Sequence, residues 1–308
     1  MSRKSLPPKF KGVLLIMAAN VLFAINMPVS RELTPEWIDP FGLSQYRITF
    51  AFITLYILGL FVKDEGGKFT FKEHLILILA GLMGTAANQL SFLAGLSMTS
   101  PVDASLIITI TPIITMVFAA IIIKEPISLK KSVGVIVGMS GAAIILYTAQ
   151  YGHFDQSGTL KGNLVVLISC FVYGLYLVII RPFMAKHSPV HVMKWTFMYG
   201  AIIALPLTWN KLGINNGSSS QEWFQLAYAL FMGTFAAYLL VAFSLKLLRP
   251  TTVSMFNYVQ PLIASTIAIV IGQDVLNWTK PLSAILIFTG VYLVITSKSR
   301  ADLDQRVN

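Results

Sequence analysis

The feature that most constrains this chain is a near-continuous series of long apolar runs separated by short polar segments. The hydrocarbon core of a bilayer is about 30 Å thick, and a helix needs about 20 apolar residues to cross it. Only 12% of the residues are charged and 56% are hydrophobic, whereas soluble domains carry about 25% charged residues. The pattern predicts an integral membrane protein with many crossings.

The runs are apolar on all sides, as in SLIITITPIITMVFAAIII, and lack the period-two alternation of a membrane β-strand. The expected fold class is therefore an all-α integral membrane protein with ten transmembrane helices. These helices are expected near residues 11–29, 40–62, 74–96, 102–123, 132–149, 162–181, 189–209, 223–247, 251–272 and 281–297.

The distribution of basic residues predicts the orientation. Ten crossings place both termini on one side, and Lys and Arg concentrate on the cytoplasmic side of membrane proteins. Most of the 23 Lys and Arg residues, including Lys280, are assigned to the N-terminal side. The residues assigned to the opposite side are Arg31, Lys161, Lys211, Lys246 and Arg249. We therefore expect a multi-pass protein of the cytoplasmic membrane with both termini in the cytoplasm.

An internal repeat relates the two halves of the chain. Met83-Gly84-Thr85 matches Met232-Gly233-Thr234, 149 residues further on. At the same offset, Pro40, Pro101, Pro112, Glu125 and Gly141 match Pro189, Pro250, Pro261, Asp274 and Gly290. Because five is odd, two five-helix units enter the membrane from opposite sides. The sequence predicts two inverted repeats, at residues 10–150 and 160–298, an arrangement that many transporters use to expose a central site to each side in turn.

The repeat resembles a known transporter family. Its Gly84-Thr85 and Asn88-Gln89 pairs, the mid-helix Pro112, the acid Glu125 and a glycine-rich fifth helix are similar to those of the EamA-type transporters of the drug/metabolite transporter superfamily. Arg47 also resembles the arginine usually found in that family's second helix. The resemblance implies a ten-helix bundle around a central cavity, in a family that exports amino acids, other small metabolites and drugs.

The resemblance covers residues 10–298, with two departures from the family pattern. Phe23-Ala24 stands where Trp-Gly is usual in the first helix, and Gln273-Asp274 stands where Gly-Glu is usual in the second repeat. These departures leave the expected fold unchanged and the substrate open.

Arg47 is the most informative residue for function. It follows Pro40 by seven residues, about 10 Å along a helix that rises 1.5 Å per residue. At that depth a charge costs several kcal/mol unless it faces protein or water. One interpretation is that Arg47 faces the cavity and attracts a substrate carboxylate. The alternatives are an ion pair with Asp103, near the outer end of the fourth helix, or a side chain that extends to the membrane surface.

Amide and tyrosine side chains inside the apolar runs supply the other candidates for the cavity wall. Buried amides form hydrogen bonds between helices or line a polar path, and tyrosine combines an aromatic face with a hydroxyl group. The expected cavity residues are Asn88, Gln89, Tyr173, Tyr176, Tyr238, Asn257, Tyr258 and Gln260. For each of them, packing between helices is the alternative.

Two prolines are expected to kink helices, either as a fixed shape or as a hinge. Pro112 and Pro261 each remove one backbone hydrogen bond and are expected to kink the fourth and ninth helices. Their matched positions in the repeats favour a shared mechanical role.

Three acids lie at helix boundaries. Glu125 and Asp274 are placed at the cytoplasmic ends of the fourth and ninth helices, and Asp103 at the outer end of the fourth. Glu125 and Asp274 are expected to pair with Lys124, Lys131 or Lys280, or to act as a gate or coupling group, and Asp103 is the candidate partner of Arg47. Acids are essentially absent from the helices away from their ends, so we expect transport driven by the substrate's own gradient rather than by protons.

Several functional classes lack their sequence signals. The four histidines form no HExxH or Cys/His cluster, the single cysteine, Cys170, cannot form an internal disulfide, and no P-loop or Gly-x-Ser-x-Gly is present. We therefore expect no metal, no cofactor and no enzyme activity. The expected partners are a small-molecule substrate and membrane lipid, not nucleic acid, with the protein acting as a monomer or homodimer.

The sequence thus predicts a secondary transporter that exports amino-acid-like or drug-like metabolites by alternating access. One alternative is a nucleotide-sugar or sugar-phosphate carrier, which would need several cations in its cavity. The other is a membrane enzyme or signalling protein on the same fold, which would need convergent acids, bases or metal ligands.

Overall fold

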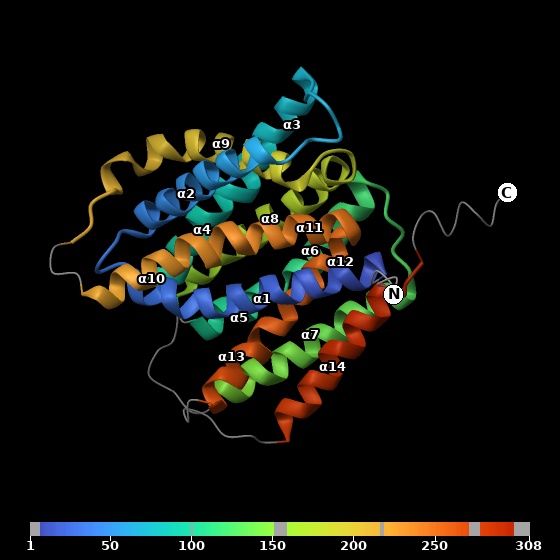
Figure 1. The fold of residues 1–308 in the computed structure, drawn as a ribbon. Helices are drawn as coiled ribbons and strands as arrows, with labels where there is room; N and C mark the ends of the chain where they lie inside the picture. The colour runs from blue at the N-terminus through green and yellow to red at the C-terminus, as the bar shows by residue number, and fades with distance from the viewer. Residues whose placement is uncertain (1–6, 100, 151–158, 216–218, 271–277, 299–308) are drawn as a thin grey trace, which may run out of the picture.

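The computed structural model is a bundle of helices (Figure 1). It describes residues 7–99, 101–150, 159–215, 219–270 and 278–298. Within these ranges the structure contains no β-strand, and a single bridge joins Ile38 to Ile214. Seven of the described helical segments are long and apolar enough to cross a membrane. The prediction of an all-α membrane protein is therefore confirmed at this level.

The helices follow one another in the same order in the two halves. The first half contains α1 (Pro8–Leu33), α2 (Pro40–Phe61), α3 (Phe71–Gly81), the π-helix η1 (Leu82–Ala87), α4 (Asn88–Met98), α5 (Pro101–Ile108), α6 (Thr111–Ile122) and α7 (Leu129–Gln150). The second half contains α8 (Leu160–Lys186), α9 (Pro189–Thr208), the 3-10 turn η2 (Trp209–Lys211), α10 (Ser220–Leu230), the π-helix η3 (Phe231–Ala236), α11 (Ala237–Leu247), α12 (Pro250–Met255), the 3-10 turn η4 (Phe256–Tyr258), α13 (Val259–Val270) and α14 (Thr279–Ile295).

The seven spans are α1, α2, α3 to α4, α5 to α6, α8, α9 with η2, and α10 to α11. The helix α14 is a shorter apolar helix. The helix α7 and the pair α12 and α13 occupy the two remaining places at which the sequence predicts a crossing. The number of ten crossings stays a prediction.

The structural elements repeat at the same offset of 149 residues as the sequence. The segments α3, η1 and α4 begin and end at the positions that correspond to α10, η3 and α11. Contacts between the halves are also reciprocal: α1 packs on α11 while its equivalent α8 packs on α4, and α2 contacts η3 while α9 contacts η1. Equivalent helices pair directly in α2 with α9 and in α7 with α14 (Figure 1). Such an exchange of partners is what a two-fold relation produces.

Both π-helices lie at close contacts between the two halves. A Cβ atom at Gly84 of η1 would overlap the ring of Tyr176, and one at Gly233 of η3 would overlap the side chain of Asn26. Glycine is therefore required at both positions. A π-turn commonly marks a functional site inside an α-helix, and the residues directly after η1 and η3 begin α4 and α11.

Both predicted proline positions coincide with interrupted helices. The helix α5 ends at Ile108 and α6 begins at Thr111, directly before Pro112. The helix α12 ends at Met255, and after the 3-10 turn η4 the helix α13 begins two residues before Pro261. A proline leaves the carbonyl one turn earlier without its usual N–H partner, which accounts for an interruption on the N-terminal side of each.

Contacts of Arg249 correct its predicted side. The Ser244 hydroxyl, near the end of α11, donates to the Gly12 carbonyl at the start of α1. Five residues later, Arg249 lies 3.5 Å from Glu125 and donates to the Lys298 carbonyl, just beyond α14. Arg249 therefore belongs to the face on which α1 begins, which we call the N-terminal face, and not to the opposite face.

Two further assignments were wrong for the same reason. Lys246 lies 3.9 Å from Glu65, in the α2–α3 loop of the N-terminal face, and Lys280 lies at the opposite end of α14 from Lys298. In an inverted repeat, each loop of the second half lies across the membrane from its equivalent in the first half. The predicted sides of Lys246, Arg249 and Lys280 were those of their equivalents, which would be correct only for a direct repeat. Asp274 lies outside the described residues.

Ionic contacts connect segments on the N-terminal face. Glu125 pairs with Lys131 at 2.9 Å, and both side chains are buried. In the α2–α3 loop, Asp64 lies 2.9 Å from His187 Nδ1 and accepts the Ser188 N–H. Burial raises the pKa of Asp64, but these hydrogen bonds outweigh that effect and hold the pKa below its ordinary value, so this carboxylate is charged at neutral pH.

The opposite face is connected by backbone and aromatic contacts and by a partly exposed ion pair of Lys211 with Asp39 at 3.3 Å. Ile38 and Ile214 form the bridge between the α1–α2 loop and the segment after α9. The Asn215 N–H donates to the Trp37 carbonyl at 3.0 Å, and Trp37 packs edge-to-face on Trp223 at 5.3 Å between ring centroids. The two faces therefore differ in burial: the Glu125–Lys131 ion pair of the N-terminal face is buried, whereas the Lys211–Asp39 pair is partly exposed.

This arrangement predicts which positions share a face. We expect cysteines introduced at Lys68 and Lys298 to react with a bulky, membrane-impermeant maleimide from one side of sealed vesicles. A cysteine at Ser219 should react from the other side, because the contacts of Arg249 tie the end of α14 to the face opposite the α9–α10 loop. The parent chain, whose Cys170 is buried, is the unlabelled control. Labelling of Lys298→Cys together with Ser219→Cys would contradict the fold.

Candidate functional site

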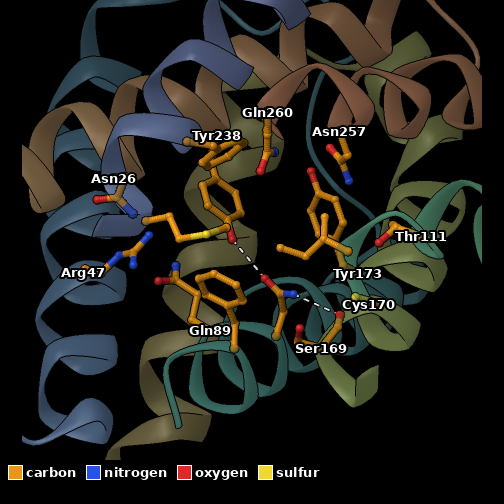
Figure 2. Close-up of a pocket in the computed structure, with 15 residues that line it drawn as sticks. Asn26, Arg47, Gln89, Thr111, Ser169, Cys170, Tyr173, Tyr238, Asn257 and Gln260 are labelled. Atoms are coloured by element: carbon orange, nitrogen blue, oxygen red, sulfur yellow. Dashed lines mark hydrogen bonds between the residues drawn. The ribbon is translucent and has the colours of Figure 1, made fainter. Parts of the chain in front are cut away.

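A cavity of about 100 Å³ lies where the two halves meet (Figure 2). Its wall comes from both halves: Phe23, Asn26 and Met27 of α1, Arg47 of α2, Asn88, Gln89 and Phe92 of α4, Ile108 of α5, Thr111 of α6, Ser169, Cys170 and Tyr173 of α8, Tyr238 of α11, Asn257 of η4 and Gln260 of α13. Pockets for drug-sized ligands are typically about 300–1,000 Å³, so this cavity suits a small solute.

At three positions of the repeat, the equivalent residues of both halves line the cavity. The pairs, each 149 residues apart, are Gln89 with Tyr238, Ile108 with Asn257, and Thr111 with Gln260. The cavity therefore lies between equivalent parts of the two halves, at the interrupted helices α5 to α6 and α12 to α13. The paired side chains differ, so the cavity is symmetric in position and asymmetric in chemistry.

Arg47 is the only charged side chain among the described residues that line the cavity. It is 4% exposed, and its partners are neutral. Nε donates to Thr234 Oγ1 at 2.7 Å, one Nη donates to the Gly233 carbonyl at 3.3 Å, and the other reaches Ser30 Oγ at 3.5 Å. Within the described contacts Arg47 forms no ion pair with Asp103 or any other carboxylate. A guanidinium has five N–H donors, so two remain for a ligand.

The amides of the cavity differ in whether their donors and acceptors already have hydrogen-bond partners in the protein. Asn88 donates to the Ser169 carbonyl at 3.1 Å and accepts the Tyr238 hydroxyl at 3.0 Å. Gln260 Nε2 donates to Asn20 Oδ1 at 2.8 Å. The carboxamide of Gln89 has no hydrogen-bond partner for either of its buried polar atoms in the structure.

The structure brings most of the predicted cavity residues together. Those that line the wall are Arg47, Asn88, Gln89, Tyr173, Tyr238, Asn257 and Gln260. Tyr176 and Tyr258 do not line it and are buried in the core instead. The Tyr176 hydroxyl lies 3.3 Å from Met193 Sδ, and the Tyr258 hydroxyl donates to the Val135 carbonyl at 3.3 Å.

Several wall residues were not expected from the sequence. They are Phe23, Asn26, Met27, Phe92, Ile108, Thr111, Ser169 and Cys170. Asn26 is an amide in an apolar run and meets the criterion used for Asn88. Applying the repeat offset to Asn257 and Gln260 would have found Ile108 and Thr111. An apolar residue such as Phe92 carries no signal that separates a cavity wall from a lipid-facing surface.

The family model described as the EamA-like transporter family matches residues 10–147 and again residues 160–296. The chain belongs to the EamA-like transporter family. The resemblance noted in the sequence to the EamA-type transporters of the drug/metabolite transporter superfamily is thereby confirmed. This EamA-like chain is a multi-pass membrane protein of a transporter family.

Individual relatives are similar over different lengths. An uncharacterized transporter of Bacillus subtilis (strain 168), YyaM, is 22% identical over 260 residues, which are 84% of this chain and 85% of YyaM. A probable terminal-alkyne amino-acid exporter of Streptantibioticus cattleyicolor is 27% identical over 168 residues, 54% of each chain. A crystal structure with 16% identity matches with a TM-score of 0.72, over 93% of this EamA-like chain and 97% of the other, and supports the fold alone.

The contrast between Tyr238 and Tyr258 gives a test of the cavity. Tyr238→Phe removes a hydroxyl at the wall, and we expect KM for transport to change about fivefold, the factor that corresponds to one hydrogen bond of about 1 kcal/mol. Tyr258→Phe is the matched control in the core and should lower the melting temperature while KM stays unchanged. Equal effects of both variants on KM would contradict this placement.

Proposed function

We propose that this protein is a secondary transporter that exports small, carboxylate-bearing, amino-acid-like metabolites from the cytoplasm by alternating access. The observation that carries the proposal is Arg47, a charged side chain at the wall of a small central cavity, held by neutral partners and with N–H donors to spare. A buried charge without a counter-ion is costly in a membrane. A bound carboxylate would neutralise Arg47 and form two parallel hydrogen bonds with it.

The proposed topology has ten crossings of the cytoplasmic membrane, with the N-terminal face in the cytoplasm. The corrected sides support it. Lys246 and Arg249 belong to the N-terminal face and Lys280 to the opposite face. With these sides, the basic residues are more concentrated on the N-terminal face than in the assignment from the sequence. Such a concentration is typical of the cytoplasmic side. In intact cells, the Ser219→Cys variant should then be labelled from outside.

Alternating access is proposed because the cavity lies between halves that pack reciprocally. Inverted repeats permit each half to take the arrangement of the other, which closes one face and opens the opposite one. The proposed unit is a monomer or homodimer surrounded by lipid.

The alternatives receive less support from the cavity wall. A nucleotide-sugar or sugar-phosphate carrier would need several cations for the phosphate charge, and among the described wall residues Arg47 is the only one. A cationic drug would need a carboxylate that the described wall does not supply. The wall also lacks the convergent acid and base of an enzyme. The printed name of the Streptantibioticus relative, a probable amino-acid exporter, favours the amino-acid-like class.

Substitution of Arg47 tests the proposal. We expect Arg47→Ala to reduce transport of carboxylate substrates about 10-fold to 100-fold in proteoliposomes, because a hydrogen-bonded charged contact contributes about 1.5–3 kcal/mol. Arg47→Lys, which keeps the charge, should retain more activity. Thr196→Val, at the equivalent position of the second repeat, is the matched control and should transport normally. If Arg47→Ala folds and transports like wild type, the cavity charge has no role and the proposal fails.

Energy coupling gives a second test. Proton-driven carriers commonly hold an acid within the membrane, whereas the described wall contains none and Glu125 is paired with Lys131 and Arg249. We expect flux in proteoliposomes to follow the substrate gradient and to be unchanged by an imposed pH gradient. Concentrative uptake driven by pH and abolished by Glu125→Gln or Asp103→Asn would refute this mechanism.

A further inference from the structure

Gln89 is a buried amide whose hydrogen-bonding capacity is unused. Its side chain is 3% exposed, and neither Oε1 nor Nε2 has a partner in the structure. Buried polar groups are nearly always hydrogen-bonded, and leaving one unpaired is costly. Because Gln89 also lines the cavity, its free donor and acceptor point to a ligand.

The backbone contacts place Gln89 beside Arg47. Ser44 Oγ donates to the backbone carbonyl of Gln89 at 3.1 Å. Ser44 and Arg47 are three residues apart on α2 and therefore share one face of that helix. Figure 2 shows the Gln89 carboxamide and the Arg47 guanidinium at the same end of the cavity, with Tyr173 and Thr111 at the other.

Two other amides of the wall are already committed to protein partners, whereas Asn26 has a buried, unpaired Oδ1 but no buried, unpaired donor in the described structure. Asn88 is held between Ser169 and Tyr238, and Gln260 is bonded to Asn20. Gln89 thus differs from both in offering an acceptor oxygen and a donor nitrogen next to the cavity's charged group.

We propose that Gln89 selects zwitterionic α-amino acids over other carboxylates. Its Oε1 accepts an N–H of the substrate ammonium group, while its Nε2 donates to the carboxylate that Arg47 holds. One carbon atom separates the two groups of an α-amino acid, so adjacent side chains reach both. The remainder of the substrate extends towards Tyr173. This inference rests on the proposed function, because it assumes that Arg47 binds the carboxylate.

A neutral amide suits this position for an electrostatic reason. A carboxylate at position 89 would form an internal ion pair with Arg47 and compete with the substrate for the guanidinium. The amide oxygen accepts from the ammonium group and leaves the charge of Arg47 available.

The test compares matched ligands and matched variants. The probes are L-alanine with L-lactate, and L-leucine with L-2-hydroxy-4-methylpentanoate, pairs that differ only in an amino group or a hydroxyl. Transport of each is measured in proteoliposomes. We expect wild type to prefer each amino acid at least about 10-fold, consistent with hydrogen bonds to charged groups of about 1.5–3 kcal/mol. Gln89→Met, similar in shape, should reduce that preference by weakening the amino acids more than the hydroxy acids.

Two further variants make the result specific. Gln89→Glu should weaken both members of each pair, because the new carboxylate occupies Arg47. Gln260→Met, which alters another amide of the wall, is the control and should change both members of a pair by the same factor. Monodispersity and melting temperature are checked for each variant.

The outcomes separate this inference from the proposed function. If wild type transports amino and hydroxy acids equally well, or if Gln89→Met weakens both equally, carboxylate transport stands and the role of Gln89 is overturned. If wild type transports none of the probes, or if transport is independent of Arg47, the proposed function itself fails. Where Gln89→Met does not fold, Gln89→Glu decides: transport of all four probes as in wild type would overturn the role of Gln89.

Discussion

The close approach of the two halves at Gly84 and Gly233 is the contact on which the rest of the structure depends. Because neither glycine has a side chain, Tyr176 of α8 and Asn26 of α1 pack against the π-helices of the opposite half. The same junction places Thr234 and the Gly233 carbonyl within hydrogen-bonding distance of Arg47. Packing, the orientation of the buried charge and the position of the cavity therefore have a common origin.

The two faces of the bundle differ in the chemistry that closes them. The N-terminal face has a buried carboxylate, Glu125, between Lys131 and Arg249. The opposite face has the bridge of Ile38 with Ile214, the contact of Trp37 with Trp223 and a partly exposed ion pair of Lys211 with Asp39. Buried ion pairs depend strongly on having both partners present, whereas apolar and backbone contacts are insensitive to charge. A backbone built from two similar halves is therefore closed asymmetrically.

The sequence was sufficient for the class of fold and for much of the site. Apolar runs determine helices in a membrane, and the fixed offset between matching glycines and prolines revealed the repeat. The residues of the cavity wall were harder to predict, because the depth of a residue along an apolar run does not show which way its side chain faces around the helix. Tyr176 and Tyr258 lie as deep as Tyr173 and Tyr238 but turn into the core. The π-turns have no sequence signal of their own. The sides of Lys246, Arg249 and Lys280 follow from alternating the ten predicted crossings, and the assignment of these residues from the sequence did not apply that alternation.

The π-helices also determine where the chain tolerates a change in length. A π-turn holds one residue more than an α-helical turn in the same stretch of helix. Deleting one residue from Leu82–Ala87 would restore α-helical winding and leave the orientation of α4 unchanged. An added residue that the π-turn does not absorb would instead rotate α4 by about 100°, the angle between successive residues of an α-helix. Asn88 and Gln89 would then turn away from the cavity, and the same insertion in Phe231–Ala236 would displace Tyr238. Surface loops accept insertions at little cost, whereas these two segments do not.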